Sequence, residues 1–262
     1  MFISTVQVGF LNNYTMIINH IKTLVKSLTT PLIPALGNKV ALEQRGEQQM
    51  ETFRLLEQLY FWLTGLTVVP VYVLADFFIR MFFGAEYVLP GTILLLMCAD
   101  MYVHISQDVC LSFLTANGLF RKRRNISIGG AIINIVVSLL LMKPFGIVGI
   151  LAGTAVSQVY YWLARSIVAI RQCLGQGLRS VAHYWIKQLG LLGIIAASIW
   201  ISGAVTQRVF VLNPVLTFIV NGVICEACFA ALAFLCCHWI EAERRLEGIV
   251  GGMLLRRFHK RA

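Results

Sequence analysis

Long apolar stretches separated by short polar gaps run along the whole 262-residue chain. A helix needs about 20 predominantly apolar residues to cross the roughly 30 Å hydrocarbon core of a bilayer, and most of the stretches reach that length. The pattern predicts seven helical segments, at residues 9–36, 59–80, 88–117, 126–142, 145–164, 188–207 and 214–239. The expected fold class is therefore all-α, a polytopic membrane helix bundle with about seven transmembrane helices.

The composition supports this interpretation, because 58% of the residues are hydrophobic and only 13% are charged. A soluble globular domain is about 45–50% apolar. Six of the seven cysteines fall inside apolar stretches, where they are expected to act as small hydrophobic side chains. Cys225 and Cys228 have the spacing of a metal or redox pair, but no second pair or suitably spaced histidine accompanies them. We therefore expect no metal and no cofactor.

Positive charge alternates along the chain, with 17 of the 22 Lys and Arg residues in every second gap and three in the gaps between. Short loops rich in Lys and Arg remain in the cytoplasm, so the C-terminus is predicted to be cytoplasmic and, with an odd number of spans, the N-terminus outside. Orientation accounts for the net charge of +10, and no nucleic-acid partner is expected. The 17 residues are Lys39, Arg45, Arg54, Arg121, Lys122, Arg123, Arg124, Arg165, Arg171, Arg179, Lys187, Arg244, Arg245, Arg256, Arg257, Lys260 and Arg261.

The first helical segment holds the two remaining cations, Lys22 and Lys26, among other polar residues. Thr15, Asn19, Lys22 and Lys26 are spaced by four, three and four positions, which places them on one face of a helix. This face is expected to line water and to attract an anionic group such as a phosphate or pyrophosphate. The alternative is that the two lysines extend to an interface or pair with an acidic residue.

A second polar cluster lies in the third segment, where Asp100, His104 and Asp108 follow at intervals of four, with Gln107 adjacent. The group could form a proton or cation relay, in which the histidine titrates near neutral pH between two carboxylates. It could equally be a static network that joins helices through hydrogen bonds, which is the interpretation we favour. Elsewhere, Asp76 and Arg80 are expected to pair.

The fifth segment carries Gly149, Gly153 and Ser157 at every fourth position, a small-residue pattern that lets two helices pack closely. Glu226 is the lone carboxylate of the seventh segment, and a structural role or a protonated state is expected for it. No nucleotide-binding loop, HExxH motif or GxSxG motif occurs, so we do not expect an enzyme.

The polar first segment would insert poorly by itself, because each lysine at the centre of a span costs about 2.5–3.5 kcal/mol on insertion scales. It needs helices that are already in the membrane. Together with the predicted outside N-terminus, this leads us to expect that the chain is the C-terminal part of a longer protein.

Several stretches, in order along the chain, resemble one family of bacterial membrane proteins. They are VGFLNNYTMIINHIKTLVKSLTTPLIPALGN at 8–38, LYFWLT at 59–64, FIRMFFGAEYVLP at 78–90, ANGLF at 116–120 and INIVVSLLLMKPFGIVGILAGTAVS at 133–157. The ordered set is similar to the Wzx-type oligosaccharide flippases, the polysaccharide biosynthesis proteins of the MATE-like exporter superfamily. The resemblance extends through about residue 160 and fades in the last two helical segments.

The resemblance implies a fold of about fourteen helices, in two lobes of six plus two at the C-terminus, around a cationic cavity that opens alternately to each side. It implies that the protein exports polyprenyl-pyrophosphate-linked oligosaccharide across the bacterial plasma membrane. Residues 1–170 would be part of the C-terminal lobe, residues 171–240 the two further helices, and residues 241–262 a basic cytoplasmic tail. Lys22 and Lys26 would be the cavity cations.

The whole first lobe is the point at which this chain departs from the family pattern. The expected partners are accordingly the lipid-linked oligosaccharide, the bilayer, and either the missing N-terminal half or other polysaccharide-assembly proteins. Two alternatives remain open. One is a cation-coupled drug exporter of the related fold, in which Asp100 and Asp108 would be essential, and the less favoured one is an integral-membrane lipid-sugar transferase.

Overall fold

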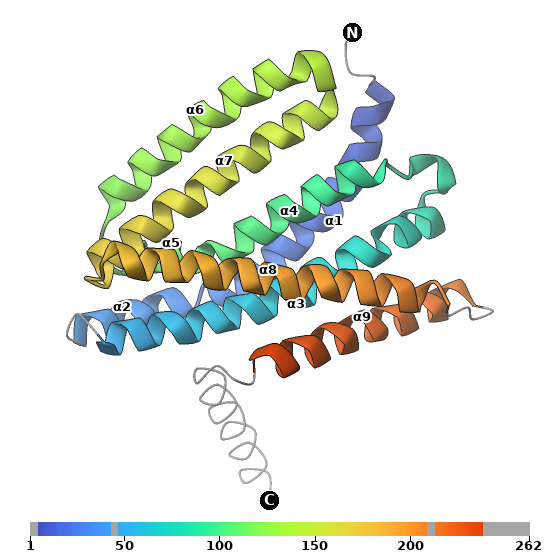
Figure 1. Ribbon diagram of the computed structural model, residues 1–262. Coiled ribbons are helices and arrows are strands. Elements are labelled where there is room, and N and C mark those ends of the chain that lie inside the picture. The colour runs from blue at the N-terminus through green and yellow to red at the C-terminus, as the bar shows by residue number, and fades with distance from the viewer. Residues whose placement is uncertain (1–4, 43–46, 209–212, 238–262) are drawn as a thin grey trace, which may run out of the picture.

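Helices make up almost all of the computed structural model, which describes residues 5–42, 47–208 and 213–237 and contains no strand within those ranges (Figure 1). The all-α, polytopic fold class is confirmed. The α-helices are α1 (Thr5–Thr29), α2 (Leu32–Leu42), α3 (Glu47–Phe82), α4 (Gly91–Ser106), α5 (Asp108–Ala116), α6 (Phe120–Phe145), α7 (Ile147–Val168), α8 (Leu178–Thr206) and α9 (Pro214–Cys237). A 3₁₀ turn, η1 (Ala85–Tyr87), precedes α4, and a π-helical turn, η2 (Ala169–Cys173), extends α7.

Six segments of the described chain are long and apolar enough to cross a membrane, which supports a multi-pass membrane protein. They correspond to α3, the α4–α5 pair, α6, α7 with η2, α8 and α9. The polar helix α1 is not among them, although it was predicted as the first of about seven spans.

Two predicted segments are interrupted. The segment predicted at 9–36 divides into α1 and α2 at Thr30 and Pro31, because the proline ring disfavours helical backbone in the residue before it. The segment predicted at 88–117 divides into α4 and α5 at Gln107, where no proline or glycine marks the break. Other helices extend past their predicted ends into the charged gaps, as α8 does at Arg179 and Lys187.

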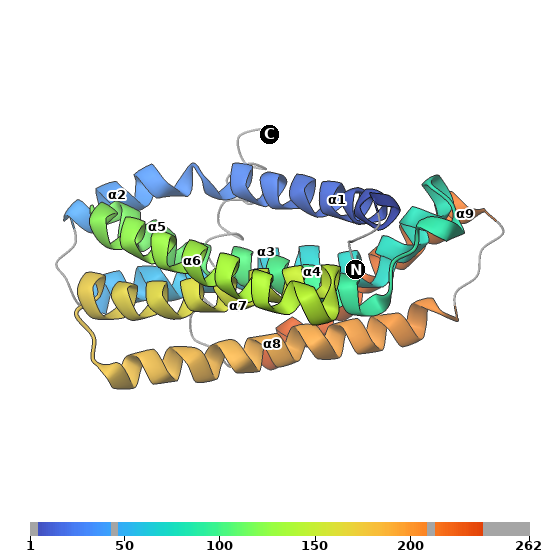
Figure 2. The ribbon, with the colours of Figure 1, turned by 90° about the horizontal axis from the view of Figure 1, so that it is seen from above.

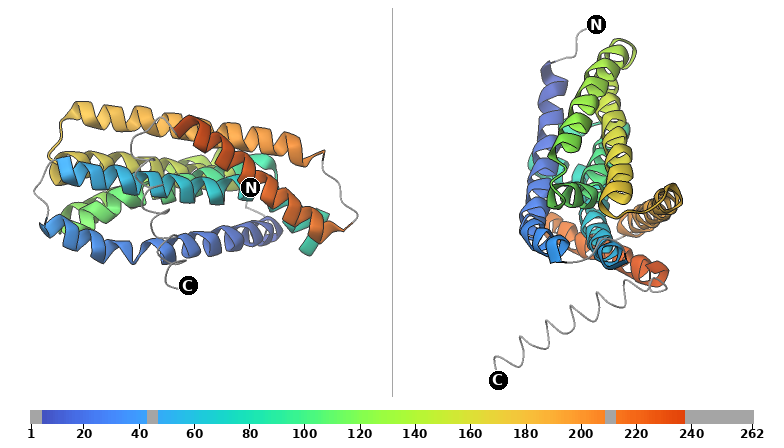
Figure 3. Two further views of the ribbon diagram at one scale, coloured as in Figure 1. Left: turned by 90° about the horizontal axis from the view of Figure 1, so that it is seen from below. Right: turned by 90° about the vertical axis from the view of Figure 1, so that its left-hand side faces the viewer.

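Helix α3 occupies the centre of the bundle and packs against α4, α8 and α9. Helix α4 packs in turn against α7, which forms an antiparallel hairpin with α6. Seen from above, α1 and α2 run along one side of the molecule and α8 along the opposite side (Figure 2). The end-on view of Figure 3 places α1 at one edge, across from α8 and α9. Helix α1 packs mainly on α4 and α3, and α2 mainly on α5.

The helix ends that carry most of the positive charge gather at one end of the bundle (Figure 1, left). The C-terminal ends of α2, α5 and η2 meet the N-terminal ends of α3, α6 and α8 there, and we call this the basic end. It carries Lys39, Arg54, Arg121, Lys122, Arg123, Arg124, Arg171 and Arg179. Arg80, Lys143 and Arg208 lie in helix ends or connections at the opposite end. Arg45 and the tail at 241–262 lie outside the described residues.

Large apolar side chains cover the outer surface of α6, where Ile128, Ile132, Ile135 and Leu139 are more than half exposed and Leu140 is 68% exposed. Water would disfavour so much contiguous apolar surface, whereas lipid tails accommodate it. The outer side of α6 is therefore suited to face lipid.

The inner side of α6 lies very close to α7. A Cβ atom added to Gly149 would stand 2.1 Å from the backbone oxygen of Leu141, and one added to Gly153 would stand 2.2 Å from Ser138 Oγ. Ser157, one turn further along α7, is buried and accepts a hydrogen bond from Asn134 of α6 at 3.2 Å. The structure thus places all three small residues of this pattern at the α6–α7 contact.

Candidate functional site

Helix α1 turns its buried stripe, formed by Tyr14, Ile18 and Val25, toward the bundle. Lys22 lies at the edge of this stripe and reaches α4, where its Nζ donates to Asp100 Oδ2 at 2.5 Å. Both side chains are largely buried, with 17% and 18% of their surface exposed. Lys22 therefore pairs with an acidic residue inside the bundle, which was the alternative interpretation of this lysine, and it is not a free cation in a cavity.

Of the other three residues of the predicted substrate face, Thr15 is half-buried, as Lys22 is, and two lie further outward. Thr15 donates its hydroxyl to the backbone oxygen of Leu11, four residues earlier, at 2.9 Å. Asn19 and Lys26 are exposed, and Lys26 forms no ion pair with any residue in the part of the chain that is described. Of the two lysines singled out from the sequence, Lys26 is thus the one available to a ligand.

The outward surface of α1 mixes polar and apolar side chains. Besides Asn19 and Lys26, it exposes Asn12, His20, Thr23 and Ser27, together with Met16, Leu24 and Leu28. A helix beside lipid would expose apolar side chains almost exclusively. This surface is therefore suited to water or to another protein.

The polar cluster at Asp100 to Asp108 does not form a continuous relay among the described residues. Asp100 bonds to Lys22 of α1, and its Oδ1 atom is buried without a partner. No hydrogen bond of the described chain joins His104 to either carboxylate. Gln107, at the break between α4 and α5, instead donates to Gln158 Oε1 of α7 at 2.8 Å. The cluster therefore connects α4 and α5 to their neighbouring helices.

Arg165 of α7 completes this connection, although it was assigned from the sequence to a basic gap. Its Nη1 donates to Gln107 Oε1 at 2.9 Å, and its guanidinium carbon lies 4.9 Å from the centre of the Tyr161 ring. The Nε atom is buried and has no acceptor in the described chain. Arg165 is thus held firmly while part of its donor set remains unused.

Cations of α1, α6 and α7 act electrostatically on charged groups of α4 and α5. Lys22, Lys26 and Arg165 all act electrostatically on His104. Asp108 interacts with Arg165, Lys26 and Arg123. It forms no hydrogen bond or ion pair with any residue that the structure describes.

The expected pair of Asp76 with Arg80 is not formed within the described residues. Asp76 Oδ1 instead accepts the hydroxyl of Tyr14 at 2.7 Å, and the same hydroxyl accepts the backbone N–H of Leu89 at 3.3 Å. Tyr14 thereby joins α1 to the start of α4 and the end of α3. A spacing of four residues favoured Arg80, but the tertiary contact with α1 supplies a different partner.

A search of protein-family models, curated proteins and solved structures found no match to this chain. The resemblance to oligosaccharide flippases therefore remains a prediction from the sequence.

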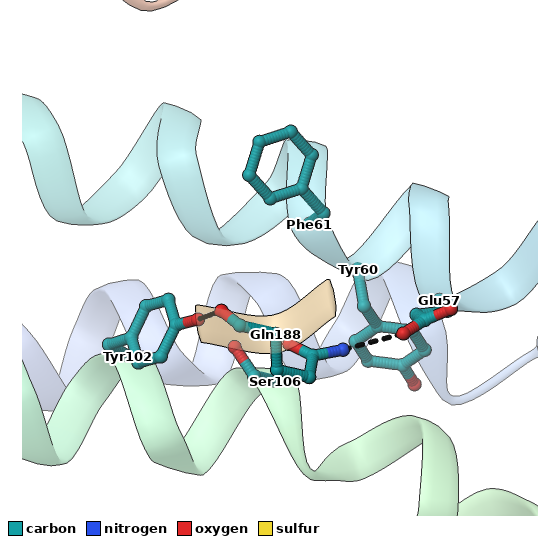
Figure 4. Close-up of a pocket in the computed structure, with 6 residues that line it drawn as sticks. All are labelled: Glu57, Tyr60, Phe61, Tyr102, Ser106 and Gln188. Atoms are coloured by element: carbon teal, nitrogen blue, oxygen red, sulfur yellow. Dashed lines mark hydrogen bonds between the residues drawn. The ribbon is translucent and has the colours of Figure 1, made fainter. Parts of the chain in front are cut away.

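Sequence reasoning missed a second buried charged group, centred on Glu57 of α3. This carboxylate is 4% exposed and accepts bonds from Lys187 Nζ and Gln188 Nε2, both at 2.6 Å. Figure 4 shows the Gln188 amide directed at Glu57 beside a small pocket between α3, α4 and α8, also lined by Tyr60, Phe61, Tyr102 and Ser106. An acidic residue next to an apolar stretch was the available signal, but Glu57 lies outside the segment predicted at 59–80 and no role was predicted for it.

The cysteines and Glu226 give no metal centre. Cys225 is fully buried, and the described chain contains no group of three or more His, Cys, Asp or Glu side chains that could hold a metal ion. One oxygen of Glu226 is buried without a hydrogen-bond partner among the residues described. Among the described residues, no charged side chain contacts Glu226 with which it could relay a proton.

Proposed function

We propose that this chain is the C-terminal part of a flippase that exports lipid-linked oligosaccharide across the bacterial plasma membrane. The observation that carries the proposal is α1, a polar helix that lies along a bundle of six membrane-spanning segments and exposes Lys26, Asn19 and His20 on its outward surface. These side chains are unsuited to lipid.

The chemistry of the substrate requires such a surface. A pyrophosphate and a glycan cannot enter hydrocarbon without losing their hydration, which costs several kilocalories per mole for each unsatisfied polar group. Polar side chains and fixed positive charge must replace that water during transport. Helix α1 supplies amides, hydroxyls and an ammonium group along one continuous surface.

The distribution of charge supports an orientation with the basic end in the cytoplasm. In this orientation α1 runs from the outer side to the cytoplasmic side, and α9 runs back toward the basic end, which would put the C-terminus in the cytoplasm. Residues 1–170 would form part of one lobe, with α8 and α9 as the two further helices.

The outward surface of α1 would face a second lobe, which this chain lacks. Alternating access in transporters of this kind is a rocking of two lobes about a site between them. We therefore propose that the chain acts with an N-terminal half, or with other polysaccharide-assembly proteins, and not as an enzyme. One lobe by itself cannot alternate.

The test is transport by the 262-residue chain combined with the N-terminal half of such a flippase in liposomes. A fluorescent polyprenyl-pyrophosphate oligosaccharide is followed by its loss of accessibility to an impermeant quencher. We expect Lys26→Gln to slow transport by about tenfold, the effect of about 1.4 kcal/mol on the barrier. Lys143→Gln, an exposed lysine at the opposite end, is the matched control and should leave the rate unchanged.

Equal rates for Lys26→Gln and Lys143→Gln would count against the assignment of α1 as the substrate surface. A cation-coupled drug exporter is the second candidate, because Asp108 lacks a hydrogen-bond partner among the described residues. For that exporter, Asp108→Asn would abolish efflux of a cationic dye, whereas Lys26→Gln would have little effect.

A further inference from the structure

We propose that the half of α6 nearest the basic end binds an anionic phospholipid of the surrounding membrane. Arg121 and Arg124 hold the phosphate of this lipid, and the apolar side chains that follow them on the same face of α6 contact its acyl chains. The site lies on the outer surface of the α6–α7 hairpin and involves no residue of α1. The inference is therefore independent of the proposed function.

The two arginines continue the lipid-facing side of α6. Ile128, Ile132 and Leu139 are exposed on that side, and Arg124 stands four residues, about one helical turn, before Ile128. Arg121 precedes Arg124 by three residues, a spacing that places both side chains on the same face of the helix. Both arginines are exposed. The two cations and the apolar stripe thus form one continuous surface.

The other two cations of this stretch point in different directions. Arg123 Nη1 donates to the hydroxyl of Thr115 in α5 at 3.3 Å, so this side chain reaches back toward the bundle. Lys122 stands one turn before Ile126, which is buried. The positive-inside rule depends on the number of Lys and Arg residues near the end of a span and not on the helix face that they occupy. It therefore does not explain why two arginines lie in line with the apolar stripe.

Arg121 and Arg124 have no counter-charge among the described residues. Neither forms a hydrogen bond or an ion pair with any of them, and the ion pairs found there belong to Lys22 and Lys187. The first turn of α6 contains no acidic residue. Like charges in adjacent positions repel one another. An anion from outside the chain relieves that repulsion.

The exposed apolar stripe is as long as one leaflet of a bilayer is thick. Ile128 and Leu139 are 11 positions apart, which at 1.5 Å per residue corresponds to about 16 Å along the helix axis. Half of the hydrocarbon core is about 15 Å thick. With the arginines at the level of the headgroups, the acyl chains of one phospholipid extend from Ile128 to Leu139.

Tyr160 of α7 adds a polar group where the headgroup meets the acyl chains. A Cβ atom added to Gly129 would stand 2.5 Å from the Tyr160 hydroxyl oxygen, so this hydroxyl lies against α6 at the level of Ile128. Tyrosine is enriched at this depth of a membrane, because its ring is apolar and its tip is polar. From Arg124 through Tyr160 to Ile132, the surface follows the order of phosphate, glycerol esters and acyl chains in a phospholipid.

The charge of this surface selects an anionic lipid over a zwitterionic one. Phosphatidylglycerol carries one net negative charge, whereas the phosphate of phosphatidylcholine is accompanied by a quaternary ammonium group. That ammonium group is repelled by two unpaired arginines. A soluble acidic protein would match the arginines, but it would leave the apolar stripe of α6 uncovered. A lipid matches both parts of the surface.

The test is native mass spectrometry of the 262-residue chain in detergent micelles, equilibrated with equal amounts of phosphatidylglycerol and phosphatidylcholine that carry the same acyl chains. We expect the chain to retain phosphatidylglycerol about tenfold more strongly. Arg121→Gln/Arg124→Gln should bring the two lipids to nearly equal retention, because each arginine at the headgroup level changes affinity by about fivefold, or about 1 kcal/mol. The matched control, Arg171→Gln/Arg179→Gln, removes two exposed arginines at the same end and should keep the preference.

An equal loss of preference in the two double variants would overturn the site, and so would the absence of any preference in the unmodified chain. Excess inorganic phosphate should not displace phosphatidylglycerol, and displacement would show that the apolar stripe plays no part. Should the double variant unfold, Arg121→Gln and Arg124→Gln decide separately, and unchanged preference in both overturns the inference. The proposed function stands or fails by the transport assay alone.

Discussion

Lys22 and Asp100 are 78 positions apart in the sequence but share one short hydrogen-bonded ion pair. Both lie mostly inside the bundle, where a charge that loses its partner is costly. Removing one member of a buried ion pair typically destabilises a protein by about 3–5 kcal/mol, whereas replacing both can be nearly neutral. The pair therefore fixes α1 to α4 without necessarily adding net stability.

This reasoning predicts that Lys22→Gln and Asp100→Asn each lower stability by about 2–4 kcal/mol. The double variant Lys22→Gln/Asp100→Asn should lose much less than the sum, because the two amides can hydrogen-bond to each other. Thermal unfolding in detergent micelles, followed by circular dichroism, measures the three changes. Additive losses would mean that the two side chains do not interact in solution.

For single residues, the sequence predicted positions along a helix but not the tertiary partners of the side chains. The spacing of Thr15, Asn19, Lys22 and Lys26 predicted one strip of a helix, because helical periodicity is a local property, and all four lie in α1. It could not supply the partner of Lys22, which depends on how α1 packs against α4. Glu57 was missed for the same reason, since Lys187 and Gln188 approach it from a helix more than 100 residues away.

At the scale of helices, apolarity predicted most of the spans, and their ends were the least accurate part. The charged residues 121–124 and Arg179 were assigned to gaps, yet they continue α6 and α8. Long charged side chains are good helix formers and can reach water from the end of a span. The division at Pro31 had a visible signal, whereas the break at Gln107 arises where side chains bond to α7.

The α6–α7 hairpin gives a prediction at this scale. Gly149→Ala should destabilise the protein by about 1–3 kcal/mol, because the new methyl group meets the backbone oxygen of Leu141, which cannot move aside. Gly190→Ala in α8 is the matched control, since nothing lies within 4 Å of its Cβ position. It should be neutral or stabilise by up to about 1 kcal/mol. Thermal unfolding of both variants gives the comparison, and equal stability would refute close packing at Gly149.

For the whole molecule, the separation of charge between its two ends is the property that the sequence predicted best. Alternation of basic gaps is a global pattern, and the helices bring the basic gaps to one end because each span reverses direction. The arrangement of α1 at the edge of the bundle could not be predicted in this way. It depends on which side of α4 remains uncovered by α7.

The orientation is tested with two variants, Lys143→Cys and Lys122→Cys, made separately in a chain whose native cysteines are replaced by alanine. An impermeant maleimide added to intact cells should label the cysteine at Lys143 and should reach the one at Lys122 only after permeabilisation. The positive-inside rule is the physical reason. Labelling of the position at Lys122 in intact cells would reverse the proposed orientation.

The ion pair between α1 and α4 also sets an order of events during synthesis. Asp100 leaves the ribosome 78 residues after Lys22, which at about 5–20 residues per second is a delay of about 4–16 seconds. During that interval Lys22 cannot form its ion pair, because Asp100 has not yet been synthesised. Helix α1 can therefore reach its final place only after α4 has been made, so a helix that is synthesised earlier depends for its position on one that is synthesised later.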